Sequence, residues 1–392
     1  MKELRKRWIW VILVSFIVIL GACSPKDEKE PNGDDNTETP VEDPANNDGE
    51  DSDPVTNNPE EEEEPENPII EGEEKTLATN LKVPWAIDFD GENFYISQRE
   101  GSIVRVSLEG EVVEEQVQLS DNLSDASEAG FLGFLLHPEQ ENTAFAYYTY
   151  ENASGQFNRV VVLKNEDGVW KETDILLDRI PSGFVHHGGR IKIGPDGKLY
   201  VTAGDAANPS VAQNLQSLGG KILRMNLDGS IPEDNPFEDS YVYSYGHRNP
   251  QGLVWDEQGV LYSSEHGQSA HDEINRIKAG VNYGWPNIQG DQEAQGMKKP
   301  LAHSGQSTWA PSGMDIWEGV LFVAQLRGEG ILAVNPSTGE TKQVITGYGR
   351  IRDVFILDGY LFFVTNNTDG RGNPGPEDDR FIAIKLKEEF KF

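Results

Sequence analysis

Two different patterns of hydrophobic and polar residues divide the chain near residue 76. Beyond this point, aliphatic and aromatic residues alternate with polar ones in short runs, which are separated by turns rich in Gly, Asp and Pro. No long stretch shows the sustained 3.6-residue period of an amphipathic helix. The pattern therefore predicts many short strands.

A short turn phrase recurs through this strand-rich region. A Gly, often preceded by Asp, comes directly before a strand whose first residues are aromatic or β-branched, which favours a tight turn into a strand. The copies are Asp90-Gly91 before FYIS, Asp196-Gly197 before LYVT, Gly259 before LYSS, Gly319 before LFVA and Asp358-Gly359 before LFFV. A looser sixth unit, in which His137-Pro138 leads into AFAYYTY, fits the wide gap between the first two copies.

Six such units over roughly 315 residues give about 50 residues each, a size that radial four-stranded repeats use. We therefore predict an all-β fold, a six-bladed β-propeller of four-stranded antiparallel blades, over residues 76–392. A two-sheet sandwich is the alternative, but it does not explain the recurring turn phrase. Closure of the ring is expected from a strand within residues 380–387 that pairs with the first blade, or from the reverse.

The N-terminal segment predicts export from the cytoplasm. Residues 1–23 have a basic start, an apolar core and then small residues before Cys23, the single cysteine of the chain, and this is how a secretory signal is built. The ending Leu20-Gly21-Ala22-Cys23 resembles a bacterial lipobox, which implies a lipoprotein signal peptide and a lipidated Cys23. The alternatives are a membrane-spanning anchor and an ordinary cleaved signal with a chance cysteine. All three make the remainder extracytoplasmic, and the lipobox implies a lipid anchor on the outer face of the bacterial cell membrane.

Residues 24–75 consist almost entirely of Asp, Glu, Asn, Pro, Gly and Thr. Such a segment cannot bury enough apolar surface to offset its chain entropy, so we predict a disordered acidic linker. The whole chain of 392 residues carries a formal net charge of -34. This charge argues against a nucleic-acid partner, because phosphates need basic residues.

Polar residues that turns do not require gather in a few segments of the strand-rich region. His186 and His187 lie in a Gly-rich loop, and either imidazole is suited to take a proton from a hydroxyl near neutral pH. Several arginines, whose guanidinium groups form fixed forks for carboxylates, would suit a polyacidic ligand. The plainer alternatives are a hydrogen-bonded turn histidine and arginines paired with surface carboxylates. Adjacent strand residues point to opposite faces, so we do not expect the two histidines to share a metal ion.

Five longer segments carry a resemblance to a known family. They are GHRNPQGLVWDEQGVLYSSEHG, DEINRIKAGVNYGWPN, HHGGRIKIGPDGKLYVTAGD, GGKILRMNLDGSIPEDNPF and RIRDV. They are similar to segments of the soluble glucose/sorbosone dehydrogenases, the aldose dehydrogenases that depend on pyrroloquinoline quinone (PQQ), and they follow one another along the chain in the same order as in that family. The likeness extends from about Val83 to Lys387.

The resemblance implies a catalytic mechanism for named residues. His186 matches the family's base, which removes the proton of the anomeric hydroxyl of an aldose while hydride leaves for PQQ, giving the lactone. Arg248 matches the residue that polarises the quinone oxygen. The matches to the residues that hold PQQ are Asn249, Thr308, Arg327, Arg350 and Arg352, together with Arg248. Glu128 and His186 match substrate contacts.

The same resemblance implies calcium. Gly267 and Gln268 match the two residues whose backbone carbonyls bind the calcium ion at PQQ, and calcium accepts such oxygen ligands whatever the side chain. A second calcium ion, and a homodimer built on it, are expected around Glu273, Tyr283 and the stretch from Asn287 to Gln292, although the match fades after Pro286.

Several residues depart from the family pattern. Arg327 stands in place of a lysine, Gln268 in place of a proline, Glu128 in place of a glutamine near the substrate, and Val185 in place of an aspartate beside the base. The loop after Asp205 is also shorter than in the best-known glucose enzymes. We therefore expect a more open site of broader or different sugar specificity.

Two other functions remain as alternatives. One is a non-catalytic binding module that kept the propeller and lost PQQ, and the other is a calcium-dependent lactonase. The joint presence of His186, Arg248, Asn249 and the pair Arg350 and Arg352 favours the dehydrogenase. The electron acceptor is not encoded in any motif, and the lipid anchor suggests a membrane quinone or a cytochrome.

Overall fold

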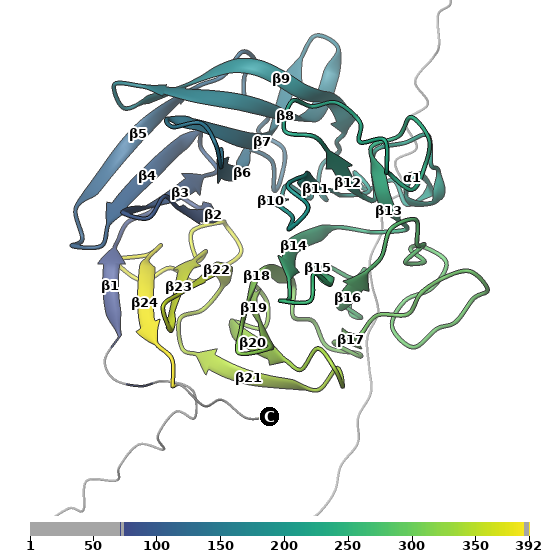
Figure 1. The fold of residues 1–392 in the computed structure, drawn as a ribbon. Helices are drawn as coiled ribbons and strands as arrows, with labels where there is room; N and C mark the ends of the chain where they lie inside the picture. Colours follow the sequence, from purple (N-terminus) through teal and green to yellow (C-terminus); the bar gives the residue numbers. More distant parts are fainter. Residues whose placement is uncertain (1–70, 72–73, 388–391) are drawn as a thin grey trace, which may run out of the picture. The chain divides into compact units, whose positions relative to one another are not determined.

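Short strands and tight turns make up nearly all of the chain that the computed structural model describes, namely residues 71, 74–387 and 392 (Figure 1). Within this region the one α-helix, α1, is a single turn at Ser210–Gln213. The prediction of an all-β fold is confirmed.

Four of the sheets in the described region have four strands each, and every adjacent pair is antiparallel. One contains β10 (Ile191–Ile193), β11 (Leu199–Ala203), β12 (Lys221–Met225) and β13 (Val242–Tyr245). The next contains β14 (Pro250–Trp255), β15 (Leu261–Glu265), β16 (Glu273–Ile277) and β17 (Ala302–His303). The third contains β18 (Pro311–Trp317), β19 (Val320–Gln325), β20 (Gly330–Val334) and β21 (Thr341–Thr346). The last contains β22 (Ile351–Leu357), β23 (Tyr360–Thr365), β24 (Phe381–Lys385) and β1 (Lys75–Ala78).

A larger sheet of eight strands joins two further antiparallel meanders. The first meander is β2 (Pro84–Phe89), β3 (Asn93–Gln98), β4 (Ser102–Ser107) and β5 (Val112–Gln118). The second is β6 (Phe131–Leu136), β7 (Thr143–Asn152), β8 (Gly155–Glu166) and β9 (Val169–Pro181). The two meet where β5 pairs with β9 in parallel.

The first strand of each meander lies nearest the centre of the fold (Figure 1). These inner strands contact one another in the circular order β2, β6, β10, β14, β18, β22 and back to β2. Apolar side chains fill the wedges between neighbouring sheets. Trp85, Leu132, Phe145 and Ile191, for example, come from β2, β6, β7 and β10 and share one buried cluster, and burying each large apolar side chain contributes about 1.5–3 kcal/mol.

Aspartates of the inner strands link one sheet to the next through backbone amides. Asp88 accepts from Leu136 N–H at 2.7 Å, Asp315 from Ile356 N–H at 2.7 Å, and Asp353 from Ile87 N–H at 2.9 Å. Asp353 also forms a buried ion pair with Arg190 at 2.7 Å. Because a buried carboxylate is costly unless it is paired, these contacts define the positions of adjacent inner strands.

The recurring turn phrase has a structural cause. In the turns before β3, β11 and β15, an Asp accepts backbone N–H groups of its own turn and also the hydroxyl of a Tyr in the strand that follows. The Asp and Tyr pairs are Asp90 with Tyr95, Asp196 with Tyr200, and Asp256 with Tyr262. Such Asx turns explain why Asp precedes an aromatic strand at regular intervals.

The first strand of the described region completes the last sheet, because β1 pairs with β24 and not with the neighbouring β2 meander. Two ways to close the ring were expected. In the observed one, the N-terminal strand β1 joins the last sheet by pairing with β24, which lies within residues 380–387. The strand β1 begins at Lys75, next to the predicted boundary of 76. The predicted signal peptide, Cys23 and nearly all of the predicted linker lie outside the described residues, and no helix within the described ones is long and apolar enough to cross a membrane.

Candidate active site

The predicted site residues lie on connections at one end of the sheets. Because strands within a sheet are antiparallel, the connection that enters the first strand and the one that joins the second to the third strand are at the same end. The connections into first strands carry Glu128, His186, Arg248, Asn249, Thr308 and Arg350. The connections between second and third strands carry Gly267, Gln268 and Arg327, and Arg352 lies in β22.

His186 is oriented by two acidic residues. Its Nδ1 lies 2.7 Å from Oδ1 of Asp205, and its backbone N–H donates to Oε2 of Glu128 at 3.2 Å. Both His186 (φ 67°) and Glu128 (φ 66°) have left-handed backbones, a strained conformation that persists only where surrounding contacts fix it. A carboxylate at Nδ1 places the ring proton there, so Nε2 keeps the lone pair that can accept a proton.

Asp205, which no sequence motif singled out, is the residue that binds the side chain of His186. It directly follows β11 and Gly204 and is fully buried. Its second oxygen, Oδ2, accepts from the indole Nε1 of Trp285 at 2.8 Å, and its backbone N–H donates to the carbonyl of Arg248 at 2.8 Å. Its position at the end of a buried strand, close in sequence to His186, is the signal that could have identified it.

His187 is buried, and both of its ring nitrogens contact neighbouring groups of the protein. It is 1% exposed, its Nε2 lies 3.0 Å from the carbonyl of Ser127, and its Nδ1 lies 3.1 Å from Oγ of Ser182. Burial lowers the pKa of His187 to about 4. Both ring nitrogens are thus engaged, which favours His186 over His187 as a base.

Arg248 and Asn249 each keep a polar atom without a partner. Arg248 donates through Nη1 to the carbonyl of His266 at 3.2 Å, while its Nε is buried and unpaired. Burial lowers the pKa of Arg248. Asn249 accepts Gly188 N–H through Oδ1 at 3.0 Å, and its buried Nδ2 has no partner among the described residues.

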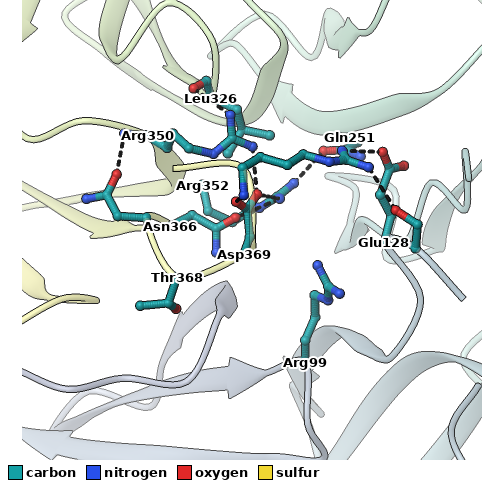
Figure 2. A network of polar contacts seen from close by, with 12 residues as sticks. Arg99, Glu128, Gln251, Leu326, Arg350, Arg352, Asn366, Thr368 and Asp369 are labelled. Carbon is teal, nitrogen blue, oxygen red and sulfur yellow. Dashed lines mark hydrogen bonds and ion pairs between the residues drawn. The ribbon is translucent and has the colours of Figure 1, made fainter. Parts of the chain in front are cut away.

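Arg350 and Arg352 converge on one carboxylate (Figure 2). Nη2 of Arg350 lies 2.6 Å from Oδ2 of Asp369, and Nη2 of Arg352 lies 3.9 Å from the same atom. Arg352 also donates to Asn366 Oδ1 and, through Nη1, to Gln251 Oε1 at 2.9 Å. Burial lowers the pKa of Arg352 to about 9. Two buried guanidinium groups share one carboxylate, which leaves net positive charge for an anionic ligand.

Arg99 is a further arginine of this site that the sequence analysis did not single out. Its guanidinium points toward Asp369 and Glu128 (Figure 2). Nε donates to the carbonyl of Ala129 at 3.1 Å. A cavity of about 10 Å³, enough for one water, is lined by Arg99, Glu128, Arg352 and Gln251 among others.

Asp272 joins the loop of Gly267 to that of Thr308. Its Oδ1 accepts Gly267 N–H at 2.8 Å, and its Oδ2 accepts the Thr308 hydroxyl at 2.8 Å together with the backbone N–H groups of Trp309 and Ala310. The backbone carbonyls of Gly267 and Gln268 accept no hydrogen bond from the described part of the chain. These carbonyls fit a hard cation such as calcium, which takes backbone oxygen ligands.

Arg327 is placed differently from the other arginines. Its side chain is exposed and forms no hydrogen bond or ion pair with the described residues, and its backbone N–H donates to the carbonyl of Trp309 at 3.0 Å. The exposed guanidinium is accessible to an anionic ligand.

Glu273 and Tyr283 are each satisfied by the chain itself. Glu273 accepts from Gly290 N–H and the Asn275 side chain, and burial raises its pKa to about 8. The Tyr283 hydroxyl donates to the Arg276 carbonyl at 2.6 Å and accepts from Lys278 N–H. Within the described residues, no group of three or more His, Cys, Asp or Glu side chains is arranged to hold a metal ion. The expected second calcium ion is therefore not supported by a preformed carboxylate cluster.

The site residues present fit a polyanionic ligand. Nε of Arg248, Nδ2 of Asn249, Nε of Arg350 and Nε2 of His266 are buried polar atoms without a partner in the part of the chain that the structure describes. Buried polar groups in proteins are nearly always hydrogen-bonded, so four such atoms at one mouth indicate where a ligand binds. Most of these atoms are hydrogen-bond donors on cationic or amide groups, which suits carboxylate and carbonyl oxygens.

Comparison with known proteins shows which family the chain resembles. The model of the glucose/sorbosone dehydrogenase family matches residues 81–373. The chain is 36% identical over 260 residues to quinoprotein glucose dehydrogenase B of Acinetobacter calcoaceticus, an alignment that covers 57% of this chain and 54% of that protein. It spans about half the length of that relative.

Two further matches cover more of the fold. An aldose sugar dehydrogenase of Escherichia coli is 28% identical over 337 residues, covering 76% of this chain and 90% of that protein. The PQQ-bound structure of an aldose sugar dehydrogenase from Streptomyces coelicolor superimposes with a TM-score of 0.75 at 36% identity, covering 82% of this chain and all of that one.

Proposed function

The chain belongs to the glucose/sorbosone dehydrogenase family, and from that premise we propose that it is an oxidoreductase that uses PQQ and calcium to oxidise an aldose sugar at its anomeric carbon to the lactone. One observation carries the proposal: a histidine whose Nδ1 is held by a buried carboxylate, His186 with Asp205, lies at the same end of the sheets as two arginines, Arg248 and Arg350, that each have a buried donor without a partner among the described residues.

The fold that we propose for this enzyme is a six-bladed β-propeller in which each four-stranded meander is one blade. The circular order of contacts among β2, β6, β10, β14, β18 and β22 supports it. The eight-stranded sheet then represents two blades whose outer strands, β5 and β9, pair across the gap between them.

The residues that would hold PQQ are polar residues at this end of the sheets, some of which keep buried donors without a partner among the described residues. Arg350 and Arg352 would bind its carboxylates, Arg248 and Asn249 its remaining oxygens, and the backbone carbonyls of Gly267 and Gln268 the calcium ion. Thr308 and Arg327 complete the expected set. When bound, PQQ supplies the two-electron acceptor for the hydride that leaves the sugar, and calcium supplies Lewis-acid polarisation.

The protein's own contribution begins with proton removal. Nε2 of His186 accepts the proton of the anomeric hydroxyl, and the new imidazolium is stabilised by Asp205 at 2.7 Å. Asp205 is in turn fixed by Trp285, so the imidazole need not reorient during the reaction. The buried charge of Arg248 stabilises negative charge that develops on a bound acceptor, because such a preorganised group acts strongly where water is excluded.

The cellular location follows from the N-terminal segment and is part of the proposal. A lipid on Cys23 would hold the enzyme at the outer face of the bacterial cell membrane, with residues 24–75 as a spacer. Electrons would then pass to a membrane quinone or a cytochrome. Metabolic labelling with a fatty-acid analogue, in the chain and in Cys23→Ser, tests the anchor, since label that persists in the variant contradicts it.

The enzymatic proposal is tested by dye-linked oxidation of a panel of aldoses by the purified full chain, with and without added PQQ and calcium. We expect activity that requires both additions and that falls by about 100-fold or more in His186→Ala, as the loss of a general base does. His137→Ala removes a histidine on another connection and serves as the matched control. A chain that binds no PQQ and oxidises no sugar of the panel contradicts the proposal.

A further inference from the structure

A turn of the last sheet reaches across to the loop that carries Glu128. Nη1 of Arg371 lies 2.6 Å from Oε1 of Glu128, and Nη2 of Arg371 donates to Oγ of Ser127 at 2.8 Å. The two loops are 243 residues apart in the sequence and belong to the connections before β24 and β6. The contact therefore bridges the mouth of the site.

The turn that carries Arg371 is fixed at its base by the arginines of the proposed cofactor site. Asp369 accepts Arg371 N–H through Oδ1 at 2.9 Å and pairs through Oδ2 with Arg350 at 2.6 Å. A Cβ at Gly372 would lie 2.6 Å from the carbonyl of Asn367 and 2.9 Å from Cδ of Arg350, so this turn packs tightly on Arg350. Arg371 thus extends from an ordered turn, although its own side chain is 48% exposed.

On the other side of the mouth, Glu128 connects Arg371 to the proposed base. One oxygen of Glu128 receives Arg371, and the other receives the backbone N–H of His186 at 3.2 Å. The Glu128 side chain is 20% exposed. Without Arg371, the carboxylate would lose the partner that sets its rotation and with it the contact to His186.

Arg371 also lowers the pKa of Glu128. Burial acts to raise this pKa, but the hydrogen bond and the charge of Arg371, together with the charge of His266 and the backbone N–H of His186, bring the value to about 2. The other titratable groups near Glu128 are Arg99, His187, Arg248, His266 and Arg352. An exposed ion pair usually contributes little, but this one has a largely buried partner that touches the site.

We propose that Arg371 is a positioning residue for sugar oxidation, which acts by binding Glu128 across the mouth of the site. It fixes the carboxylate that orients His186 and that receives a hydroxyl of the bound sugar. The inference rests on the proposed function for the second of these roles. The first role, the orientation of Glu128, is independent of any substrate.

The test compares Arg371→Gln, Arg371→Lys, Glu128→Gln and the double variant Arg371→Gln with Glu128→Gln in the PQQ-loaded full chain. Lys171→Gln is the matched control, because Lys171 is 43% exposed and forms an ion pair of the same 2.6 Å length on β9. We expect Arg371→Gln to lower kcat/KM by roughly tenfold or more, the size expected for a lost charge-assisted contact. Arg371→Lys should restore most of it, and Lys171→Gln should change nothing.

The pH profile separates positioning from a general loss of structure. His186 must be neutral to act as a base, so each of these chains should lose kcat/KM at low pH. In Arg371→Gln the pKa of Glu128 is no longer held low, so protonation of Glu128 should add to this loss and make the acid limb steeper than in the unmodified chain. The double variant lacks the carboxyl group and should lack this additional loss. A profile of Arg371→Gln that is superimposable on that of the unmodified chain overturns the proposal, as does a steeper acid limb that persists in the double variant.

A measurement without turnover distinguishes this proposal from the enzymatic one. Melting of the cofactor-free chain should show that Arg371→Gln lowers Tm more at pH 7 than at pH 4, because the unpaired Glu128 is charged only at the higher pH. In the Glu128→Gln background the two Tm differences should be equal. If this pattern is found in a chain that oxidises no sugar, the proposed function fails while the Arg371 contact stands. If Arg371→Gln lowers Tm equally at pH 7 and pH 4 in the chain that keeps Glu128 as well, the contact itself is overturned.

Discussion

Oδ1 of Asp205 lies 2.7 Å from Nδ1 of His186, and the two residues come from connections on either side of the same inner hairpin, β10 and β11. The pair is held from outside by the indole of Trp285, which donates to the other oxygen of the carboxylate. The imidazole is thereby fixed in one tautomer before any substrate arrives.

Replacement of Asp205 tests this relationship most directly. In Asp205→Asn the amide can donate to Nδ1, which favours the tautomer with its proton on Nε2 and removes the base. We expect kcat to fall by about 100-fold or more, as in other hydrogen-bonded His–Asp pairs, with a smaller change in KM. Trp285→Phe keeps the carboxylate and should lose much less activity; equal kcat values for Asp205→Asn and the unmodified chain would show that Asp205 has no role in catalysis.

His187 should make stability depend on pH. Its folded-state pKa of about 4 lies below the ordinary value of 6.5, so the unfolded chain binds a proton more readily than the folded one. The stability that the neutral His187 contributes to the folded state is fully present above about pH 6.5 and is lost progressively as pH falls toward 4. Urea unfolding between pH 7 and 4.5 should show a smaller pH dependence in His187→Gln than in the unmodified chain. The same dependence in both would assign the effect to other groups.

Asp272 should affect calcium binding, because its carboxylate joins the loop of Gly267 to the loop of Thr308. Replacing it with Asn weakens four hydrogen bonds that order the backbone around Gly267 and Thr308, so the carbonyl ligands lose their fixed positions. We expect the rise in Tm on adding calcium to shrink in Asp272→Asn. Asp256→Asn, which changes a turn aspartate of similar bonding on another connection, is the control and should keep the full response. A full response in Asp272→Asn contradicts the assignment.

Asp353 should be the most sensitive of the inner-strand aspartates. Its carboxylate is paired with Arg190, and their side chains are 4% and 2% exposed. Removing one member leaves a buried charge, so Asp353→Ala should lower the free energy of unfolding by about 3–5 kcal/mol. Asp315→Ala, which removes an amide acceptor but no arginine partner, should cost less. Equilibrium urea unfolding measures both, and a larger loss for Asp315→Ala would contradict the ranking.

The sequence was informative about the fold because its signals are local. The Asp–Tyr turns are short-range hydrogen bonds, so the pattern that they impose recurs visibly and predicts the strands, although it does not show that β1 pairs with the distant β24. The resemblance to the glucose/sorbosone dehydrogenases is confirmed by the family match.

The site was harder to predict because its contacts join distant loops. From chemistry alone His186 and His187 were equivalent, and only the partners of each ring distinguish them. Asp205, Asp369 and Arg371 received no role, because nothing in the local sequence shows that Arg371 reaches Glu128. Conversely, Glu273 and Tyr283 were grouped by resemblance, whereas their side chains are occupied by partners of their own loops.

The pairing of β1 with β24 also determines when the site can form. Arg352 belongs to the same sheet as these two strands and Arg350 directly precedes that sheet's first strand, β22, whereas β24 ends at Lys385, near the far end of the described chain. During synthesis on the ribosome, five of the six meanders can emerge before this sheet has all of its strands. The sheet that carries Arg352 is consequently the last to be completed, and under the proposed function a carboxylate-rich cofactor that needs Arg350 and Arg352 can bind only after β24 has been made.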